Sequence, residues 1–242
     1  MLCLAAGFNV QVSLLSSLSV CPLCDSAQTS LWHTETRKPL IGREYHRCQV
    51  CDLVFVPRCF HLDASSERAV YQQHENNPAD AGYRRFLGRM AEPMQNLLQA
   101  SGKTPSELSG LDFGCGPGPT LSLMFAEAGY ACSNYDLHFA HHPALLQQQY
   151  DFITSTEVFE HLAQPAQVLD QLLLCLKPGG LLGSMTQRPR DRAAFVQWHY
   201  LMDPTHISFF SETCFDWLAE HWQLQQAYLS GDVIILQRPA DC

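Results

Sequence analysis

The sequence predicts an α/β fold, in which a mostly parallel sheet carries helices on its faces and a small cysteine-rich unit precedes it. Three observations support this prediction. A glycine-rich turn at residues 111–118 joins a strand-like segment to a helix-like one. Strand-like and helix-like segments alternate after it, as they do in parallel sheets with crossover helices. Two Cys-x-x-Cys pairs lie near the N-terminus.

Charge and cysteine content narrow the classes of partner. The chain has 242 residues and a net charge of −9. A nucleic-acid interface needs clustered Lys and Arg, so this balance argues against nucleic acid as the main partner. The 11 cysteines favour a reducing compartment over a disulfide framework. We therefore expect a cytoplasmic protein with one α/β domain, a small appendage and no membrane partner.

The first stretch, residues 1–19, is apolar and carries no charge. It lacks the basic start of a signal peptide, and its second half is too polar to span a membrane. We expect an extra strand or a tail. A start codon assigned too early, with Val20 as the true initiator, is the alternative.

Residues 20–60 are predicted to form a zinc ribbon. Two cysteine pairs separated by a few dozen residues are typical of four-thiolate zinc sites. Four thiolates complete a tetrahedron and leave no open position, so the expected zinc is structural. The predicted ligands are Cys21, Cys24, Cys48 and Cys51.

Residues 61–110 are predicted to be a linker with helices that cap the sheet. A helix-like stretch at 67–75 carries Tyr71, and an Asn-Asn-Pro break follows it. Apolar residues then recur at three- and four-residue steps over 81–100, which predicts an amphipathic helix.

The glycine turn is the centre of the predicted site. Gly114, Gly116 and Gly118 alternate after Asp112. Glycines let the backbone pass close to a ligand, and the helix that follows presents free N–H groups. The dinucleotide-binding pattern would need another glycine where Pro119 stands, so this pattern is not matched.

An acidic residue ends the next predicted strand, at 131–137. Asp136 follows the glycine turn at a distance of about 20 residues, where a carboxylate can accept hydrogen bonds from both hydroxyls of a ribose. The short interval between Asp136 and the strand that begins at Asp151 leaves no room for a crossover helix and another parallel strand. We therefore expect the third strand at the sheet edge to be missing or vestigial. The segments 224–229 and 233–237 are predicted to form an antiparallel hairpin.

These features together resemble the motif series of class I S-adenosylmethionine (SAM) methyltransferases. The motifs are Asp-x-Gly-x-Gly-x-Gly at 112–118, Glu-Val-Phe-Glu-His at 157–161 and Lys-Pro-Gly-Gly at 177–180. The resemblance covers about residues 67–237 and implies a Rossmann-like SAM-binding domain over 111–242. A zinc ribbon before such a domain is similar to the sugar-nucleotide C-methyltransferases, and also to certain ribosomal-RNA guanine methyltransferases.

The resemblance implies a donor site above the glycine turn. Asp112 would face the methionine amino group of SAM, Gly114 and Gly116 would underlie the amino-acid part, and Asp136 would hold the ribose. Loop residues near Leu137 would hold the adenine. The implied cofactor-binding set is Asp112, Gly114, Cys115, Gly116, Gly118, Asp136, Leu137, Thr156 and Glu157.

The acceptor side is predicted to carry a general base if the acceptor is a carbon or hydroxyl acid, whereas an amine or a thiol that ionises readily would need only desolvation. Imidazoles titrate near neutral pH, and we rank His206 first and His161 second, with Tyr71 and Tyr200 orienting the acceptor. Each histidine has the alternative role of holding a turn. The expected reaction is in-line methyl transfer to a small molecule. The alternative is an RNA or protein methyltransferase that uses the ribbon for docking.

Overall fold

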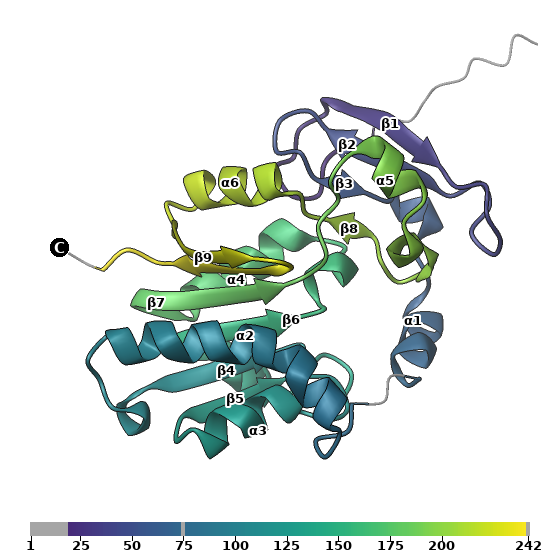
Figure 1. Ribbon diagram of the computed structural model, residues 1–242. Coiled ribbons are helices and arrows are strands. Elements are labelled where there is room, and N and C mark those ends of the chain that lie inside the picture. The colour runs from purple at the N-terminus through teal and green to yellow at the C-terminus, as the bar shows by residue number, and fades with distance from the viewer. Residues whose placement is uncertain (1–18, 74–75, 241–242) are drawn as a thin grey trace, which may run out of the picture.

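A computed structural model describes residues 19–73 and 76–240, and its architecture is the predicted α/β fold (Figure 1). Nearly all of the predicted tail at 1–19 lies outside the described residues, so its nature stays a prediction. Within the described part of the chain, no helix combines the length and hydropathy that a membrane crossing requires.

The central sheet has six strands in the order β5-β4-β6-β7-β10-β9. Four of them are parallel, and β10 runs antiparallel to both β7 and β9. This arrangement confirms the predicted mixed sheet with a C-terminal hairpin. The strands are β4 (Ser109–Phe113), β5 (Ala131–Tyr135), β6 (Tyr150–Thr156), β7 (Leu176–Met185), β9 (Gln225–Ser230) and β10 (Val233–Gln237).

The sheet ends at β5, where a third parallel strand was predicted to be missing. After β5 the chain forms an isolated bridge between Asp136 and Ala140. A short 3-10 helix, η3 (Pro143–Gln147), then leads directly to β6. The prediction from the short interval is therefore confirmed, because these residues are spent on a turn and a single 3-10 helix.

Helices cover both faces of the sheet. Phe152 and Ile153 are neighbours on β6 and point to opposite faces, as successive strand residues do. Phe152 packs with the face covered by α2 and α3, and Ile153 packs with the face covered by α4 and α6. The predicted helix at 81–100 matches α2. The helices are α2 (Ala81–Ala100), α3 (Thr120–Glu127), α4 (Pro165–Leu174) and α6 (Glu212–His221).

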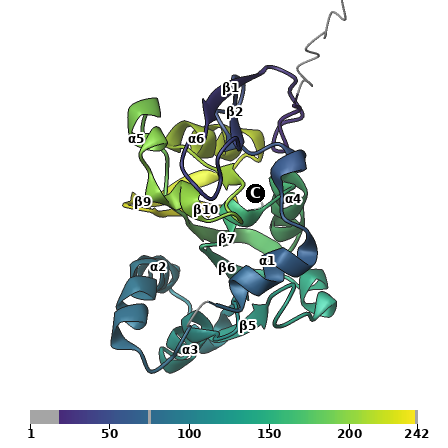
Figure 2. The ribbon, with the colours of Figure 1, turned by 90° about the vertical axis from the view of Figure 1, so that its right-hand side faces the viewer.

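One helix stands apart from both layers. α1 (Ala64–Tyr71) lies beyond the carboxyl ends of the parallel strands (Figures 1 and 2). The predicted helix at 67–75 was placed too late along the chain. The cause is Asp63, whose carboxylate accepts the N–H groups of Ser65 and Ser66 and starts the helix earlier.

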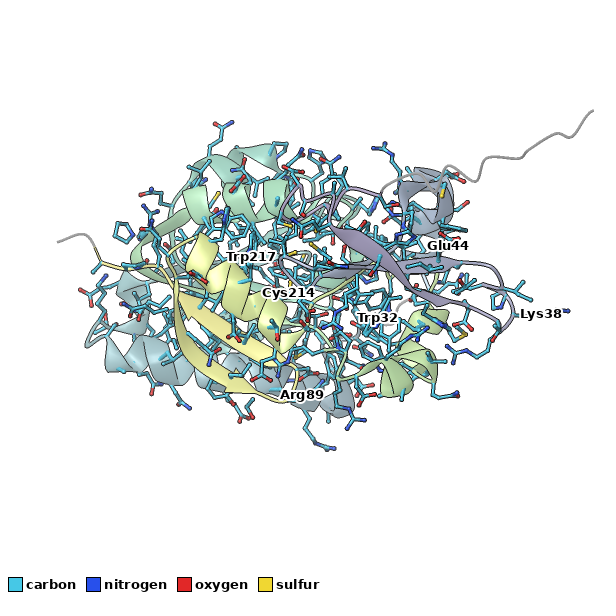
Figure 3. All side chains as sticks on the ribbon, turned by 90° about the horizontal axis from the view of Figure 1, so that it is seen from above. Trp32, Lys38, Glu44, Arg89, Cys214 and Trp217 are labelled. Atoms are coloured by element: carbon cyan, nitrogen blue, oxygen red, sulfur yellow. The ribbon has the colours of Figure 1, made fainter. Side chains whose placement is uncertain are left out.

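The cysteine-rich unit is a small sheet that is shared with the rest of the chain. β1, β2 and β3 pair antiparallel, and a fourth strand, β8, pairs with β3 through Val54 and Phe209. Seen from above, Trp32 of β1 lies against α5, and its ring is 4.7 Å from that of Phe195 (Figure 3). The elements are β1 (Thr29–Thr34), β2 (Glu44–Cys48), β3 (Val54–Phe55), α5 (Arg192–Val196), the 3-10 helix η5 (His199–Met202) and β8 (Ser208–Phe209).

Candidate functional site

A large cavity lies at the carboxyl ends of β4, β5 and β6. Its volume is about 990 Å³, and parallel α/β sheets bind their ligands at this end of the strands. Residues of α1 and α2 and of the turn after β6 contribute to its wall. The sequence-predicted residues on this wall are Tyr71, Asp112, Gly114, Cys115, Gly116, Asp136, Leu137, Thr156, Glu157, His161 and His206.

The glycine turn forms the floor of the cavity. Gly114 and Gly116 have φ angles of 79° and 66°, which glycine adopts without strain. A Cβ on Gly114 would lie 2.3 Å from Cγ2 of Val158, and one on Gly118 would lie 1.8 Å from the carbonyl oxygen of Asn76. Side chains are therefore excluded at both positions. Asn76 covers Gly118, which is not on the cavity wall in the described part of the chain.

Asp136 ties the glycine turn to the end of β5. Its Oδ2 accepts the N–H of Gly116 at 3.0 Å, and its Oδ1 accepts those of His138 at 2.8 Å and Phe139 at 3.0 Å. A carboxylate has about four lone-pair sites, so one remains for a ligand hydroxyl group. The predicted ribose-binding residue thus also holds the glycine turn and the loop after β5 in place.

Asp112 is a buried acid next to the glycine turn, only 2% exposed. The hydroxyl of Thr154 donates a hydrogen bond to its Oδ1 at 3.1 Å. Burial raises the pKa of Asp112 to about 7, and the charge of Asp136 acts in the same direction. The hydrogen bond from Thr154 lowers the pKa but does not offset the burial. A positively charged group bound beside it would favour the ionised form.

Glu157 follows β6 with an uncommon backbone conformation. Its φ is 52°, in a region that few residues other than glycine occupy. Its N–H donates to the carbonyl oxygen of Met185 at 2.7 Å. Burial and the nearby charge of Glu160 raise the pKa of Glu157 to about 8. A backbone held in this region at a cavity wall is a feature of functional sites.

His161 and His206 meet at the cavity, with ring centroids 4.8 Å apart. Nδ1 of His206 lies 2.7 Å from the carbonyl oxygen of Tyr200, and Nδ1 of His161 lies 3.2 Å from that of Thr205. A carbonyl only accepts hydrogen bonds, so each Nδ1 carries the ring proton and Nε2 is the basic nitrogen of the neutral ring. One ring can therefore hold a turn through Nδ1 and accept a proton at Nε2.

The two predicted tyrosines occupy different places. Tyr71 is on the cavity wall, with its ring 5.2 Å from that of His161 and its hydroxyl donating to Glu67 at 2.8 Å. Tyr200 is 6% exposed, and its hydroxyl donates to the carboxylate of Glu160. Tyr200 is not among the described residues that line the cavity, and its hydrogen bond to Glu160 places it behind the wall, so an orienting role for Tyr200 stays a prediction.

Glu160 is a candidate that was missed in the sequence. It is 0% exposed, and burial raises its pKa. A carboxylate oxygen of Glu160 and a ring nitrogen each from His161 and His206 lie within 4.8 Å of one another. Such a set can hold a divalent cation or share protons. The available signal was a second glutamate directly beside His161 in the segment Glu-Val-Phe-Glu-His at 157–161, since Glu is rarely buried without a partner.

The four predicted cysteines gather in the ribbon, and their Sγ atoms lie within 4.8 Å of one another. The Sγ atoms of Cys21 and Cys51 are 3.5 Å apart, and those of Cys24 and Cys48 are 3.4 Å apart. Four sulfurs bonded tetrahedrally to zinc at about 2.3 Å are about 3.8 Å from one another. The cluster therefore fits a four-thiolate metal site.

A doubly wound sheet with a glycine turn below a cavity is the arrangement in which α/β proteins bind nucleotide-like ligands. Residues 83–227 match the model of the methyltransferase domain family, and the chain belongs to that family. The ubiquinone biosynthesis O-methyltransferase of Klebsiella pneumoniae (strain 342) is 32% identical over 113 residues, which are 44% of this chain and 45% of that protein. The same enzyme of Proteus mirabilis (strain HI4320) is 27% identical over 100 residues, 41% of each chain. The chain thus spans less than half the length of these curated relatives.

Solved structures of methyltransferases show a distant similarity. The 1,6-didemethyltoxoflavin-N1-methyltransferase of Burkholderia thailandensis matches with a TM-score of 0.48 at 14% identity, over 77% of this chain and 96% of that chain. The magnesium protoporphyrin IX methyltransferase of Synechocystis PCC 6803 matches with a TM-score of 0.45 at 15% identity, over 74% of this chain and 96% of that chain.

Proposed function

We propose that this protein transfers a methyl group from SAM to a small-molecule acceptor. The observation that carries the proposal is one cavity whose wall runs from the glycine turn to His161 and His206. In-line transfer needs the donor and the acceptor to lie end to end in a shared, oriented space. The curated relatives, named as ubiquinone biosynthesis O-methyltransferases, also support a small acceptor.

The two carboxylates on the donor side of the cavity, Asp112 and Asp136, support SAM as the ligand. When bound, SAM supplies an electrophilic methyl group on a positively charged sulfonium. Asp112 would balance the ammonium group of the ligand, and Asp136 would accept a hydrogen bond from a hydroxyl of its ribose. The loop at 137–139 would hold the adenine, because the described sheet has no strand beyond β5 to supply an acid there. No protein nucleophile is required, so these residues bind and orient.

The acceptor side offers a base for a hydroxyl or a carbon acid. Nε2 of His206 would accept the proton, and Oδ2 of Asp203, 3.8 Å from it, would stabilise the imidazolium that results. His161 is the second candidate, and Tyr71 would close the wall beside the acceptor. An acceptor that ionises readily would need only positioning and desolvation from the same residues.

We expect that the protein, incubated with methyl-labelled SAM and a metabolite extract, transfers the label to compounds in the low-mass fraction. Heat-denatured protein is the control for label carried over without catalysis. Label recovered only in RNA or in protein would contradict a small-molecule acceptor and would favour the alternative in which the ribbon docks a macromolecule.

We also propose that Cys21, Cys24, Cys48 and Cys51 hold one structural zinc ion. Four thiolates leave no position for a water or a substrate, and a structural zinc site contributes folding free energy directly. The support is the geometry of the four Sγ atoms, together with the burial of Cys21, Cys48 and Cys51 in the core on the α4 and α6 side of the sheet, against which the half-buried Cys24 packs.

Elemental analysis of freshly purified protein is expected to give one zinc per chain, because the four thiols converge on a single point. Cys24→Ser is expected to lose the zinc and to lower the temperature of unfolding. Cys59→Ser is the matched control, since Cys59 is exposed and outside the cluster. A disulfide between any two of the four thiols in fresh protein would contradict the zinc site.

A further inference from the structure

Arg43 is a buried cation between the ribbon and residues 200–209, which we call the acceptor-side segment. It directly precedes β2 and is 3% exposed. Its Nη2 donates to the carbonyl oxygen of His206 at 2.7 Å, and its Nη1 lies 3.5 Å from that of Asp203. Its guanidinium carbon lies 5.6 Å from the centroid of the Tyr45 ring. A guanidinium is costly to bury, so this placement indicates a specific task.

The hydrogen bonds of the guanidinium indicate this task. The carbonyls of Asp203 and His206 belong to a turn, in which the Asp203 carboxylate accepts the N–H of Thr205 at 2.8 Å. Carbonyls at a buried turn need donors, and an arginine side chain can supply two of them from one rigid fork. Arg43 thus satisfies both ends of the turn that carries His206.

Other contacts clamp the same segment between the ribbon and the turn after β6. On the ribbon side, the Tyr45 hydroxyl donates to the carbonyl oxygen of Leu201 at 3.3 Å, and the N–H of Val56 donates to that of Ile207 at 2.9 Å. On the other side, the N–H of Ile207 donates to the carbonyl oxygen of Glu160 at 2.7 Å. The ribbon therefore reaches the residues around the paired histidines through hydrogen bonds, and it also packs against them in a shared apolar cluster that includes Tyr45 and Phe209.

We propose that Arg43 is a positioning residue for the transfer reaction and makes the ribbon a structural part of the acceptor site. The proposal rests on the proposed function of His206. The His206 ring reaches the carbonyl oxygen of Tyr200 only while its turn is in place, and this contact keeps the proton on Nδ1 and the basic lone pair on Nε2. Without Arg43, the ring loses the constraint that selects this tautomer.

Two substitutions of Arg43 remove its hydrogen bonds to the turn to different degrees. Arg43→Met keeps an unbranched side chain but removes every donor, so both carbonyls lose the guanidinium, and the carbonyl of Asp203 keeps only the N–H of His206, at 3.3 Å. Arg43→Lys keeps the charge, but one ammonium serves the two carbonyls less well than a fork does. Arg47→Met is the matched control, because Arg47 lies on β2, four residues after Arg43, is 45% exposed and pairs with Asp52 of the ribbon.

The first readout is the tautomer of His206, observed by NMR of protein labelled with ¹⁵N-histidine. The His206 signals are assigned by their absence in His206→Asn. We expect the wild type and Arg47→Met to show a neutral ring with the proton on Nδ1. Arg43→Met is expected to show both tautomers. Arg43→Lys is expected to show a smaller share of the Nε2-protonated tautomer than Arg43→Met and a larger share than the wild type. A single Nδ1-protonated tautomer in both Arg43 variants would overturn the proposal.

The second readout is the rate of label transfer from SAM to the metabolite extract. A misplaced reacting group costs up to about 100-fold, so we expect a roughly 10- to 100-fold lower rate in Arg43→Met. Affinity for S-adenosylhomocysteine should stay at the wild-type value, because the donor side does not contact Arg43. A parallel loss of this affinity would reduce the role of Arg43 to general stability and overturn the proposal.

If wild-type protein transfers no label, the proposed function fails, and the tautomer of His206 still decides whether Arg43 positions that ring. Should Arg43→Met not fold, Arg43→Lys carries both tests.

Discussion

Asp136→Ala is expected to weaken binding of S-adenosylhomocysteine by roughly 10- to 100-fold, because a hydrogen bond to a charged group contributes about 1.5–3 kcal/mol. The substitution also removes the acceptor for the N–H groups of Gly116, His138 and Phe139, so the floor of the cavity loses its tie to the end of β5. Isothermal titration calorimetry measures the loss.

Asp136→Asn separates the two effects of this carboxylate. The amide keeps one oxygen acceptor for the loop, and we expect a smaller loss than in Asp136→Ala. Asp216→Ala on the exposed face of α6 is the matched control and should bind like the wild type. Wild-type affinity in Asp136→Ala would contradict the ribose-binding role and the placement of the ligand over the glycine turn.

The affinity measured in the same titration is expected to depend on pH because of Asp112. Burial raises the pKa of Asp112 to about 7, and the ammonium group of the ligand favours the ionised carboxylate. Below pH 7 the free protein carries a protonated Asp112, and binding must first remove that proton. Affinity is therefore expected to fall as the pH drops below 7 and to level off above it. Asp112→Asn should remove this pH dependence.

The sequence predicted the elements whose signals are local. Apolar spacing over 81–100 marked α2, and the short interval after Asp136 excluded a third edge strand. The start of α1 was misplaced because Asp63, a capping residue, was not used to locate it. The pairing of β8 with β3 could not be foreseen, because a two-residue strand has no periodicity and its partner lies more than a hundred residues away in the chain.

The residues of the candidate site also differ in whether a local sequence signal marks them. The glycine turn and Asp136, predicted from the order of residues along a strand, a turn and a strand end, lie on the cavity wall, and their roles in binding stay predictions. The place of Tyr200 depends on a carboxylate 40 residues earlier, and the sequence alone gives no distance between them. Glu160 was overlooked because a buried acid acquires its meaning only from the side chains that surround it.

His206→Asn is expected to lower the rate of methyl transfer by about 10²- to 10⁴-fold, the usual contribution of a general base. Affinity for S-adenosylhomocysteine should be unchanged, because the ring lies on the acceptor side of the cavity. Single-turnover measurement at saturating SAM, with the acceptor found by labelling, isolates the chemical step from product release. Asparagine preserves polarity but cannot accept the proton.

His161→Asn and Glu160→Gln decide between the two roles open to this cluster. If Nε2 of His206 is the base, His161→Asn should cost less than His206→Asn, since His161 is then only a neighbour of the reacting proton. If the cluster instead holds a divalent cation, all three variants should lose activity alike. The wild type would then lose activity on a chelating resin and regain it with Mg²⁺ or Mn²⁺. Near-wild-type rates in both histidine variants would contradict both roles, because positioning and desolvation by the cavity would then account for the whole reaction.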